Sequence, residues 1–423
     1  QAFSGCKSIT SVTIPSGVTG IDIRAFSGCE NLTGITIPDG VTKIGESAFQ
    51  DCTKLAGVTI PDSVVNIGWG AFGYCKSLDS ITIPDSVNKI GGCAFMYCES
   101  LTKINVASEN KKYSSEKGVL FNKDKTKLIC YPNAKTDKTY SIPDGVTNIS
   151  ADAFQNCVNL TSVTIPDSVT NIGQRAFLFC KSIKNITIPE SVQDIGEYAF
   201  YGCKSLEKIN AAAGNENYVS VNGILFSKDK TKIVCYPANK NDTSYSIPSS
   251  VKVIGSGAFR DCSHLKSIMI PNSVTTMEHH AFSNCTSLTS ISIPQNITII
   301  EAATFYGCTN LTSVRIPDSV TEIGFSAFYL CNSLKNVTVP RSVTNISYYG
   351  LGFIGLEDKT SNFKIYCYSG TEAEYYAKGE KFNYVLLDKL PTLAKVTGTK
   401  LGGRAADALR INWTKNANAD GYI

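Results

Sequence analysis

The sequence has neither a long apolar run nor an excess of charge of one sign. A membrane-spanning helix needs about 18 or more consecutive apolar residues, and no run among the 423 residues comes near that length. Lys and Arg number 40 and Asp and Glu number 36, so the formal net charge is only +4. Such a balance gives no electrostatic footprint for nucleic acid or for an anionic membrane. We therefore expect no nucleic-acid partner and no membrane insertion for this chain.

Residues that serve in catalysis are also scarce. The three histidines, His264, His279 and His280, fall in one stretch, so any histidine-dependent nucleophile or metal site would have to use them. No glycine-rich phosphate loop and no Gly-x-Ser-x-Gly nucleophile elbow is present. These absences predict a protein that is not an enzyme and that binds no cofactor.

What the sequence has instead is a strict internal period, and such periods identify repeat architectures. Prolines lie 23 residues apart in three series, and the two gaps between the series are 59 residues each. Phenylalanine keeps the same spacing from Phe26 to Phe328, and cysteine keeps it from Cys29 to Cys331. The prolines of the three series are Pro15, Pro38, Pro61 and Pro84, then Pro143, Pro166 and Pro189, and then Pro248, Pro271, Pro294, Pro317 and Pro340.

One unit, residues 32–52, indicates how the repeat folds. Leu32, Ile35 and Ile37 point inward around an exposed Thr36, as a short strand requires. A Pro-Asp-Gly turn follows, and further apolar positions and an Ala-Phe-x-x-Cys segment close the coil. Stacking coils at about 4.8 Å buries all these side chains in one continuous core. The pattern predicts a β-rich, right-handed solenoid with a parallel sheet along one face, forming a curved rod on the order of 60–70 Å long.

The repeated string resembles a known family. It is Leu-x-x-Ile-x-Ile-Pro-x-x-Val-x-x-Ile-Gly-x-x-Ala-Phe-x-x-Cys, with good examples at residues 55–75 and 160–180. This string resembles the Treponema-type leucine-rich repeat of BspA-like bacterial surface proteins, over roughly residues 1–350. The resemblance implies a leucine-rich-repeat superhelix, an extracellular or bacterial cell-surface location, and attachment to host or matrix proteins.

Two longer repeats interrupt the period. Residues 104–143 and 209–248 correspond at an offset of 105 residues, which indicates that a block of that length was duplicated. Each contains two apolar stretches around a polar Lys-Asp-Lys segment, as in residues 118–132 and their near copy at 223–237. This arrangement predicts a β-hairpin in each long repeat.

After Pro340 the period stops, and we divide the chain there. Residues 1–350 form the predicted solenoid, and residues 351–390 form a terminal unit that covers its open edge. In that unit we expect strands at 363–368 and 382–387 and a short helix at 371–378 capped by Thr371. Residues 391–423 resemble the opening strands of a fibronectin type III domain, which needs roughly 90–100 residues. Because position 1 also falls inside a repeat, we expect the sequence to be part of a longer protein.

Sixteen cysteines raise the possibility of disulfides or metal binding. Most of them occupy the same inward position of successive coils, and no Cys-x-x-Cys pair provides clustered zinc ligands. Side chains stacked in parallel seldom satisfy the disulfide dihedral angle. We therefore interpret the cysteines as buried thiols that pack as small apolar groups.

Aspartates that follow the turn prolines form a second periodic row, and a glycosidase pair or a calcium ladder is one interpretation of them. The row is broken by Ser16, Ser249, Asn272, Gln295 and Arg341, all of which suit a turn. A turn role is therefore favoured. The aspartates of the row are Asp39, Asp62, Asp85, Asp144, Asp167 and Asp318.

One departure from the repeat suggests a binding site. The exposed strand position is threonine in most coils but becomes Met269, Ser292 and Arg315 in three consecutive coils. The adjacent His279 and His280 occupy the variable pair before Ala-Phe, where we expect exposed side chains. These five residues form our candidate partner-binding patch, and neutral drift is the alternative explanation.

The predicted function is a non-catalytic interaction module, a monomer that adheres to a protein or glycan partner. One alternative is a structural spacer in a larger surface protein. The other is the substrate-targeting region of an enzyme whose catalytic domain lies outside this sequence.

Overall fold

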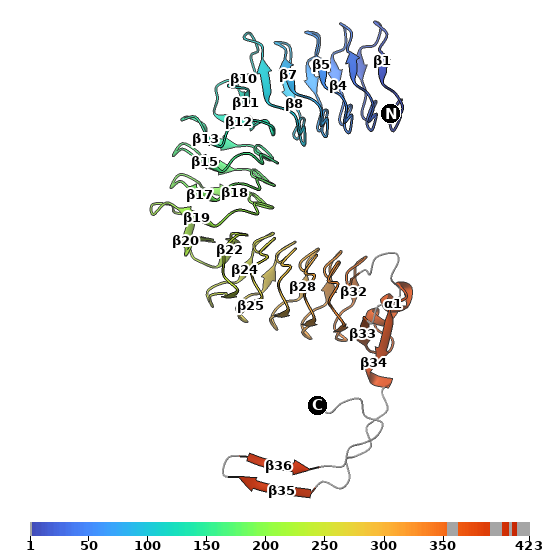
Figure 1. The fold of residues 1–423 in the computed structure, drawn as a ribbon, viewed down its shortest axis with the longest axis vertical. Helices are drawn as coiled ribbons and strands as arrows, with labels where there is room; N and C mark the ends of the chain where they lie inside the picture. The colour runs from blue at the N-terminus through green and yellow to red at the C-terminus, as the bar shows by residue number, and fades with distance from the viewer. Residues whose placement is uncertain (1, 353–362, 390–399, 406–407, 413–423) are drawn as a thin grey trace.

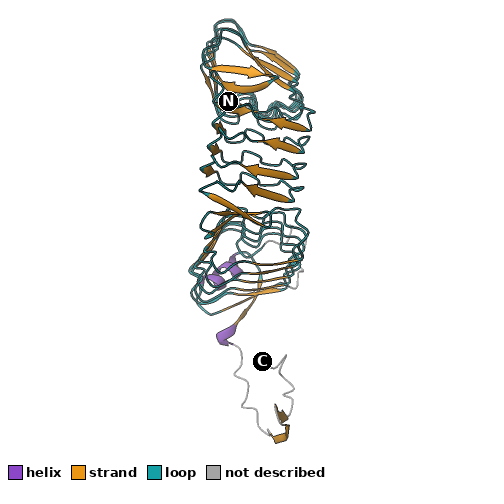
Figure 2. Ribbon diagram, turned by 90° about the vertical axis from the view of Figure 1, so that its left-hand side faces the viewer, coloured by secondary structure: helices purple, strands orange, loops and turns teal. Residues whose placement is uncertain are grey.

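The protein is a β-solenoid that bends twice. The computed structural model describes residues 2–352, 363–389, 400–405 and 408–412. Three straight stacks of coils follow one another around a C-shaped path, and the chain turns sharply between them (Figure 1). Figure 2 shows the middle stack from the side, with its strands one above another. The predicted solenoid of 23-residue coils is therefore confirmed, but its curvature is concentrated at two bends.

Each coil contributes one longer strand to a parallel sheet. Residues one period apart pair across neighbouring coils, so that Val12 lies beside Ile35 and Ile35 beside Val58. In these strands the apolar side chains point into the core while the flanking Ser, Asn or Thr faces solvent. We call them the long strands: β1 Ser11–Thr13, β3 Gly34–Thr36, β5 Gly57–Thr59, β7 Ser80–Ile83, β9 Lys103–Val106, β13 Thr139–Ser141, β15 Ser162–Thr164, β17 Asn185–Ile188, β19 Lys208–Ala211, β23 Ser244–Ser246, β25 Ser267–Met269, β27 Ser290–Ser292, β29 Ser313–Arg315 and β31 Asn336–Thr338.

A second parallel sheet, which the sequence did not predict, is built from two-residue strands after the turn. Each places one apolar side chain inward, such as Ile44 beside Ile67. We call them the short strands: β2 Gly20–Ile21, β4 Lys43–Ile44, β6 Asn66–Ile67, β8 Lys89–Ile90, β14 Asn148–Ile149, β16 Asn171–Ile172, β18 Asp194–Ile195, β24 Val253–Ile254, β26 Thr276–Met277, β28 Ile299–Ile300, β30 Glu322–Ile323 and β32 Asn345–Ile346.

Both predicted hairpins are present, and they lie at the two bends. Strands β11 Val119–Asn122 and β12 Lys127–Cys130 pair antiparallel at the first bend, as do β21 Ile224–Ser227 and β22 Lys232–Cys235 at the second. A further strand precedes each hairpin, namely β10 Tyr113–Glu116 and β20 Tyr218–Val221. The hairpin then continues into the next stack, because β12 pairs parallel with β14 and β22 with β24.

The bends divide the core, so the expectation of one continuous core was wrong. Buried side chains form three separate clusters, one in each stack. Strand β11 joins two of them, since Leu120 packs into the first cluster while Val119 and Phe121 pack into the second. Alternate residues of a strand point to opposite faces, and a strand between two stacks therefore serves both.

A ladder of aromatic rings runs through each core. Phe154 and Phe177 stack with ring centroids 5.0 Å apart, and Phe177 and Phe200 follow at 5.8 Å. Tyr131 and Tyr236 begin the ladders of the second and third stacks, and both are buried. The hydroxyl of Tyr131 donates to Asp137 and that of Tyr236 to Asp242. These hydrogen bonds satisfy hydroxyl groups that burial would otherwise leave without a partner.

The last coils lead into a different terminal unit. Strands β33 Lys364–Cys367 and β34 Asn383–Leu386 extend the long-strand sheet from β31. Helix α1 Glu372–Gly379 and the 3₁₀ turn η1 Leu387–Lys389 accompany them. Thr371 precedes the helix, but the predicted side-chain cap is wrong because its hydroxyl donates to the carbonyl of Tyr368. No helix in the described part of the chain is long and apolar enough to cross a membrane.

Strands β35 Lys400–Ala405 and β36 Ala408–Asn412 pair as an antiparallel hairpin. They belong to the segment for which we predict a fibronectin type III stub, whose other residues lie outside the described ones. That assignment stays a prediction, as do the domain boundaries at residues 350 and 390.

The inward and outward faces of a coil should differ sharply in their tolerance to mutation. Phe177 is fully buried between two stacked rings, so Phe177→Ala should lower the free energy of unfolding by about 3–5 kcal/mol. Thr164 lies exposed on the same stack, so Thr164→Ala should cost less than about 1 kcal/mol. Chemical denaturation of the two variants checks this, and equal costs would mean that the faces are assigned wrongly.

Candidate binding surfaces

The three unusual strand residues lie in one row on the long-strand sheet. Arg315 pairs with Ser292 in the register of β27 and β29, and the register of β25 and β27 puts Met269 on the other side of Ser292. All three side chains are exposed, and Met269 is 69% exposed. Two strand spacings separate Met269 from Arg315, which is about 10 Å. The structure thus brings these three predicted residues together.

The two histidines lie on another part of the coil. His279 and His280 follow the short strand β26 and precede the buried Ala281-Phe282 pair. His279 is exposed, and its Nδ1 lies 3.4 Å from Glu301 Oε2. His280 is half-buried, contrary to the expectation of an exposed side chain. The five predicted residues therefore occupy two different elements of the coil, Met269, Ser292 and Arg315 on one and the histidines on the other.

The half-buried His280 packs against aromatic rings of the second stack. Its ring lies edge-on to Tyr198 and Tyr201, with centroid distances of 5.9 and 6.1 Å. The guanidinium of Arg260 lies 3.6 Å from the centroid of the Tyr201 ring and 3.5 Å from His280 Nδ1. Burial, followed by the charge of Arg260 and by His279, lowers the pKa of His280 to about 4. His280 is therefore neutral at pH 7 and serves as part of a contact between two stacks.

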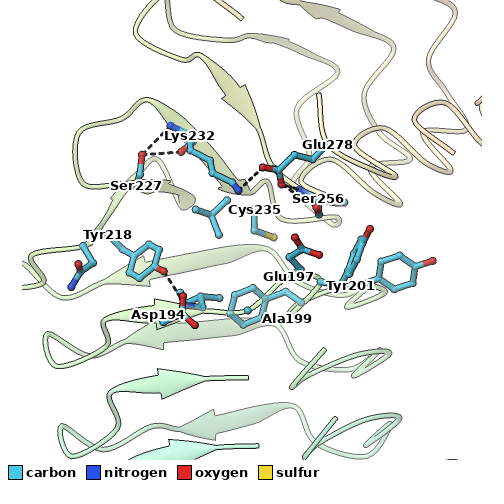
Figure 3. Close-up of a pocket in the computed structure, with 18 of the residues that line it drawn as sticks. Asp194, Glu197, Ala199, Tyr201, Tyr218, Ser227, Lys232, Cys235, Ser256 and Glu278 are labelled. Atoms are coloured by element: carbon cyan, nitrogen blue, oxygen red, sulfur yellow. Dashed lines mark hydrogen bonds and ion pairs between the residues drawn. The ribbon is translucent and has the colours of Figure 1, made fainter. Parts of the chain in front are cut away.

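A cleft opens beside this contact, at the second bend (Figure 3). It has a volume of 330 Å³ and lies between the last coil of the second stack and the first coils of the third. We call it the second cleft. Lys232 from the hairpin reaches Glu278 Oε1 at 2.7 Å, and Glu278 Oε2 accepts hydrogen bonds from the N–H and the hydroxyl of Ser256. The wall of the cleft that the third stack forms thus carries the protein's own charge pair.

The pKa of Glu278 is consistent with its ion pair with Lys232. Burial works against its charged form, but the hydrogen bond and charge of Lys232 and the two hydrogen bonds from Ser256 outweigh it. The pKa of Glu278 consequently lies below its ordinary value, and the carboxylate is ionised at neutral pH. Lys232 and Glu278 were not singled out by the sequence analysis. The signal available was that Glu278 replaces the glycine that most coils have at this position.

An equivalent cleft lies at the first bend, offset by 105 residues. This first cleft has a volume of 450 Å³. Both clefts form where a short strand has no next short strand beside it. The N–H of Ile90 donates instead to the Tyr113 hydroxyl at 2.8 Å, and the N–H of Ile195 donates to the Tyr218 hydroxyl at 2.9 Å. A tyrosine of the insertion thus closes the edge of each sheet.

The cysteine ladder lies in the core, as the packing interpretation predicted, and all sixteen cysteines are free. Each thiol of the ladder approaches a carbonyl of the preceding coil, as Cys52 Sγ does with Phe26 O at 3.1 Å and Cys98 Sγ with Phe72 O at 3.1 Å. The aspartates of the periodic row are exposed in turns. In the described part of the chain, no group of three or more His, Cys, Asp or Glu side chains is placed to hold a metal ion.

Burial of the thiols should make stability fall at alkaline pH. Burial raises the pKa of Cys98 to about 12, whereas an unfolded cysteine ionises near 8.5. Between these two values only the unfolded state loses the proton, so the free energy of unfolding decreases as pH rises, by about 1.4 kcal/mol per pH unit for one thiol. Cys98→Ala should therefore show a slope that is shallower by about this amount when denaturation is measured from pH 8.5 to 10.5. Identical slopes would mean that Cys98 ionises in the folded protein.

Comparison with known proteins was consistent with these observations. The family model for the BspA type leucine rich repeat region matches residues 1–118, 129–238 and 234–352. A solved structure of a leucine rich cell surface protein from Faecalibacterium prausnitzii A2-165 is 30% identical, covering 87% of this chain and 90% of that one with a TM-score of 0.53. A leucine-rich repeat protein from Eubacterium ventriosum ATCC 27560 is 28% identical, covering 84% and 87% with a TM-score of 0.51. No curated protein matches the sequence.

Proposed function

This chain belongs to the family of BspA-type leucine-rich repeat proteins, and from that premise we propose that it is a non-catalytic module that binds a partner at a bacterial cell surface. The similar protein from Faecalibacterium prausnitzii, which is described as a cell surface protein, supports this location. The partner we propose is a host or matrix protein or its glycan, so that the module acts in adhesion, and the module itself is a monomer.

The observation on which the binding proposal rests is the interrupted row on the long-strand sheet. In coils such as those of β3, β5 and β15, the exposed position is a threonine, which is small and uncharged. Across β25, β27 and β29, Met269 and Arg315 present an adaptable apolar group and a forked cationic donor on either side of Ser292. Methionine and arginine are enriched at protein interfaces, and arginine is a frequent hot spot.

His279 does not lie on the long-strand sheet with the other patch residues, because it follows the short strand β26. His280 contributes mainly to the contact with Tyr198 and Tyr201. We therefore place the centre of the patch at Met269, Ser292 and Arg315 and treat the histidines as its margin.

A structural spacer is the principal alternative. A spacer needs only the stacked coils, so an uninterrupted threonine row would serve it as well as the row that contains Met269 and Arg315. The second alternative, a targeting region of an enzyme, places the catalytic residues in another part of a longer protein. A full-length gene that encodes an appended catalytic domain would favour this alternative.

The patch can be tested by restoring the repeat consensus. Met269→Thr together with Arg315→Thr should weaken a partner that uses the patch by at least about 1–2 kcal/mol, the scale of a modest hot spot. Thermal stability should stay the same or rise slightly, because both residues become those of the other coils. Wild type and double variant should be screened side by side on protein and glycan arrays, with affinities then measured by surface plasmon resonance.

The matched control changes the same sheet position in the second stack. Thr164→Ser with Thr187→Ser alters two exposed residues on β15 and β17 and should leave binding unchanged. A partner that binds the Met269/Arg315 double variant as tightly as wild type would contradict the proposed patch. A wild-type module that binds nothing on either array would favour the spacer.

A further inference from the structure

The two clefts are copies of one scaffold whose side chains have diverged. Each is bounded by a short strand, a tyrosine of the insertion and the hairpin, and corresponding residues are 105 positions apart. The duplication therefore provides an internal comparison, because the same backbone arrangement surrounds two different sets of side chains. The first cleft is separate from the patch at Met269 and Arg315, so a ligand bound there would not depend on that patch.

In the second cleft the protein's own side chains satisfy one another. Lys232 pairs with Glu278 on the side of the cleft that the third stack forms, as Figure 3 shows. Nearby, Arg260 lies over the ring of Tyr201. Arg260 Nε makes no hydrogen bond, but it lies 3.5 Å from Asp261 Oδ2 and so has a charged neighbour. A ligand that used Lys232 would have to displace Glu278 from its ion pair.

In the first cleft the corresponding partners are missing. Gly173 stands where the second cleft has Glu278, so Lys127, the counterpart of Lys232, has no carboxylate within ion-pair distance among the described residues. Met96 and Gln155 stand at the positions that Tyr201 and Arg260 occupy at the second bend. An exposed cation without a partner thus stands at a cavity that is also larger, at 450 Å³ against 330 Å³.

Three buried polar atoms of residues that line the first cleft have no hydrogen-bond partner in the described structure. They are Asn133 Nδ2, Ser150 Oγ and Gln155 Oε1. Asn133 and Gln155 are each only 6% exposed. An unsatisfied buried donor or acceptor costs about 1–3 kcal/mol, so such atoms are few in native proteins and are satisfied by water or by a ligand.

The second bend lacks two of these three unsatisfied atoms. Its residues at the three positions are Ala238, Gly255 and Arg260, of which the first two have no polar side chain. The unsatisfied atoms are therefore not a requirement of the bend itself. The unsatisfied atoms of Asn133 and Ser150 are specific to the first cleft, which is also lined by the unpaired Lys127.

We propose that the first cleft binds a single acidic sugar residue. Its three atoms need both donors and acceptors from a ligand, which sugar hydroxyls supply, and Lys127 needs a carboxylate. Met96 and Ile129 offer apolar contacts for the C–H face of the sugar ring. The volume lies within the range of about 300–1,000 Å³ that is usual for small-molecule sites.

Calorimetric titration with glucuronate and with glucose tests the proposal on the intact chain. Glucuronate should bind saturably and more tightly than glucose by about tenfold, which is the scale of one charge-assisted hydrogen bond. Lys127→Met should abolish this preference, whereas the matched change Lys232→Met in the second cleft should leave it unchanged. Equal affinity for the two sugars in the wild type would overturn the proposal.

A second variant tests the buried atoms. Asn133→Ala with Ser150→Gly copies residues that the second cleft already has, so the coil should tolerate them, as circular dichroism and thermal melting would verify. Glucuronate affinity should fall by about tenfold or more in this variant. Unchanged affinity in a folded double variant, or no saturable binding by the wild type, would show that the cleft holds only water.

Discussion

The whole structure depends on the contact between one coil and the next. A single coil has one strand of three or four residues and one of two, so neither can form a sheet alone, and its inward side chains are covered only when a neighbour is present. Each neighbour supplies several interactions at once. Ile149 pairs with Ile172, Phe154 stacks on Phe177, and Cys180 Sγ approaches Phe154 O at 2.9 Å. Because every inward position makes the same contact one period later, those positions are apolar in nearly every coil, and most polar variation lies on the outside.

The bends are the places where this contact is interrupted, and they are also where the protein can differ from a plain rod. At the first bend, the side chain of Asn110 makes hydrogen bonds to backbone groups that have no neighbouring coil to pair with. Its side-chain amide donates to Pro84 O and Val87 O and accepts from the N–H groups of Lys112 and Tyr113. Asn215 makes the same contacts at the second bend. With the backbone secured in this way, the side chains that surround each cleft are free to change.

Most of the fold could be predicted from the sequence because the period exposes it. Thr36 between Ile35 and Ile37, repeated every 23 residues, identifies the inward and outward faces of the long strands. The polar segment inside residues 118–132 predicts the hairpin. The short strands were missed because two residues such as Lys43 and Ile44 are too few to show an alternating pattern. The division of the core was missed because it depends on which neighbour each face of β11 contacts, and the sequence alone does not show this.

The candidate surfaces were predictable only in part, for a similar reason. Met269, Ser292 and Arg315 share a strand position, so their alignment follows from the period. His280 was expected to be exposed, but its neighbours Tyr198 and Tyr201 lie in another stack, 82 and 79 residues earlier in the sequence. The second cleft arises because the bend brings residues 193–201 of the second stack beside residues 227–278 of the third. Sequence periodicity describes contacts between successive coils, and the bends replace those contacts with others.

The claim that coil-to-coil contact organises the molecule, and that the bends interrupt it, is tested most directly by native-state hydrogen exchange along the chain. Backbone N–H groups bonded to the preceding or following coil should be protected with a 23-residue repeat inside each stack, since they open only when neighbouring coils separate. Protection should fall at residues 108–112 and 213–217, between β9 and β10 and between β19 and β20, because these residues belong to no strand of either sheet. Uniform protection through both bends, with one opening energy for the entire solenoid, would contradict the account.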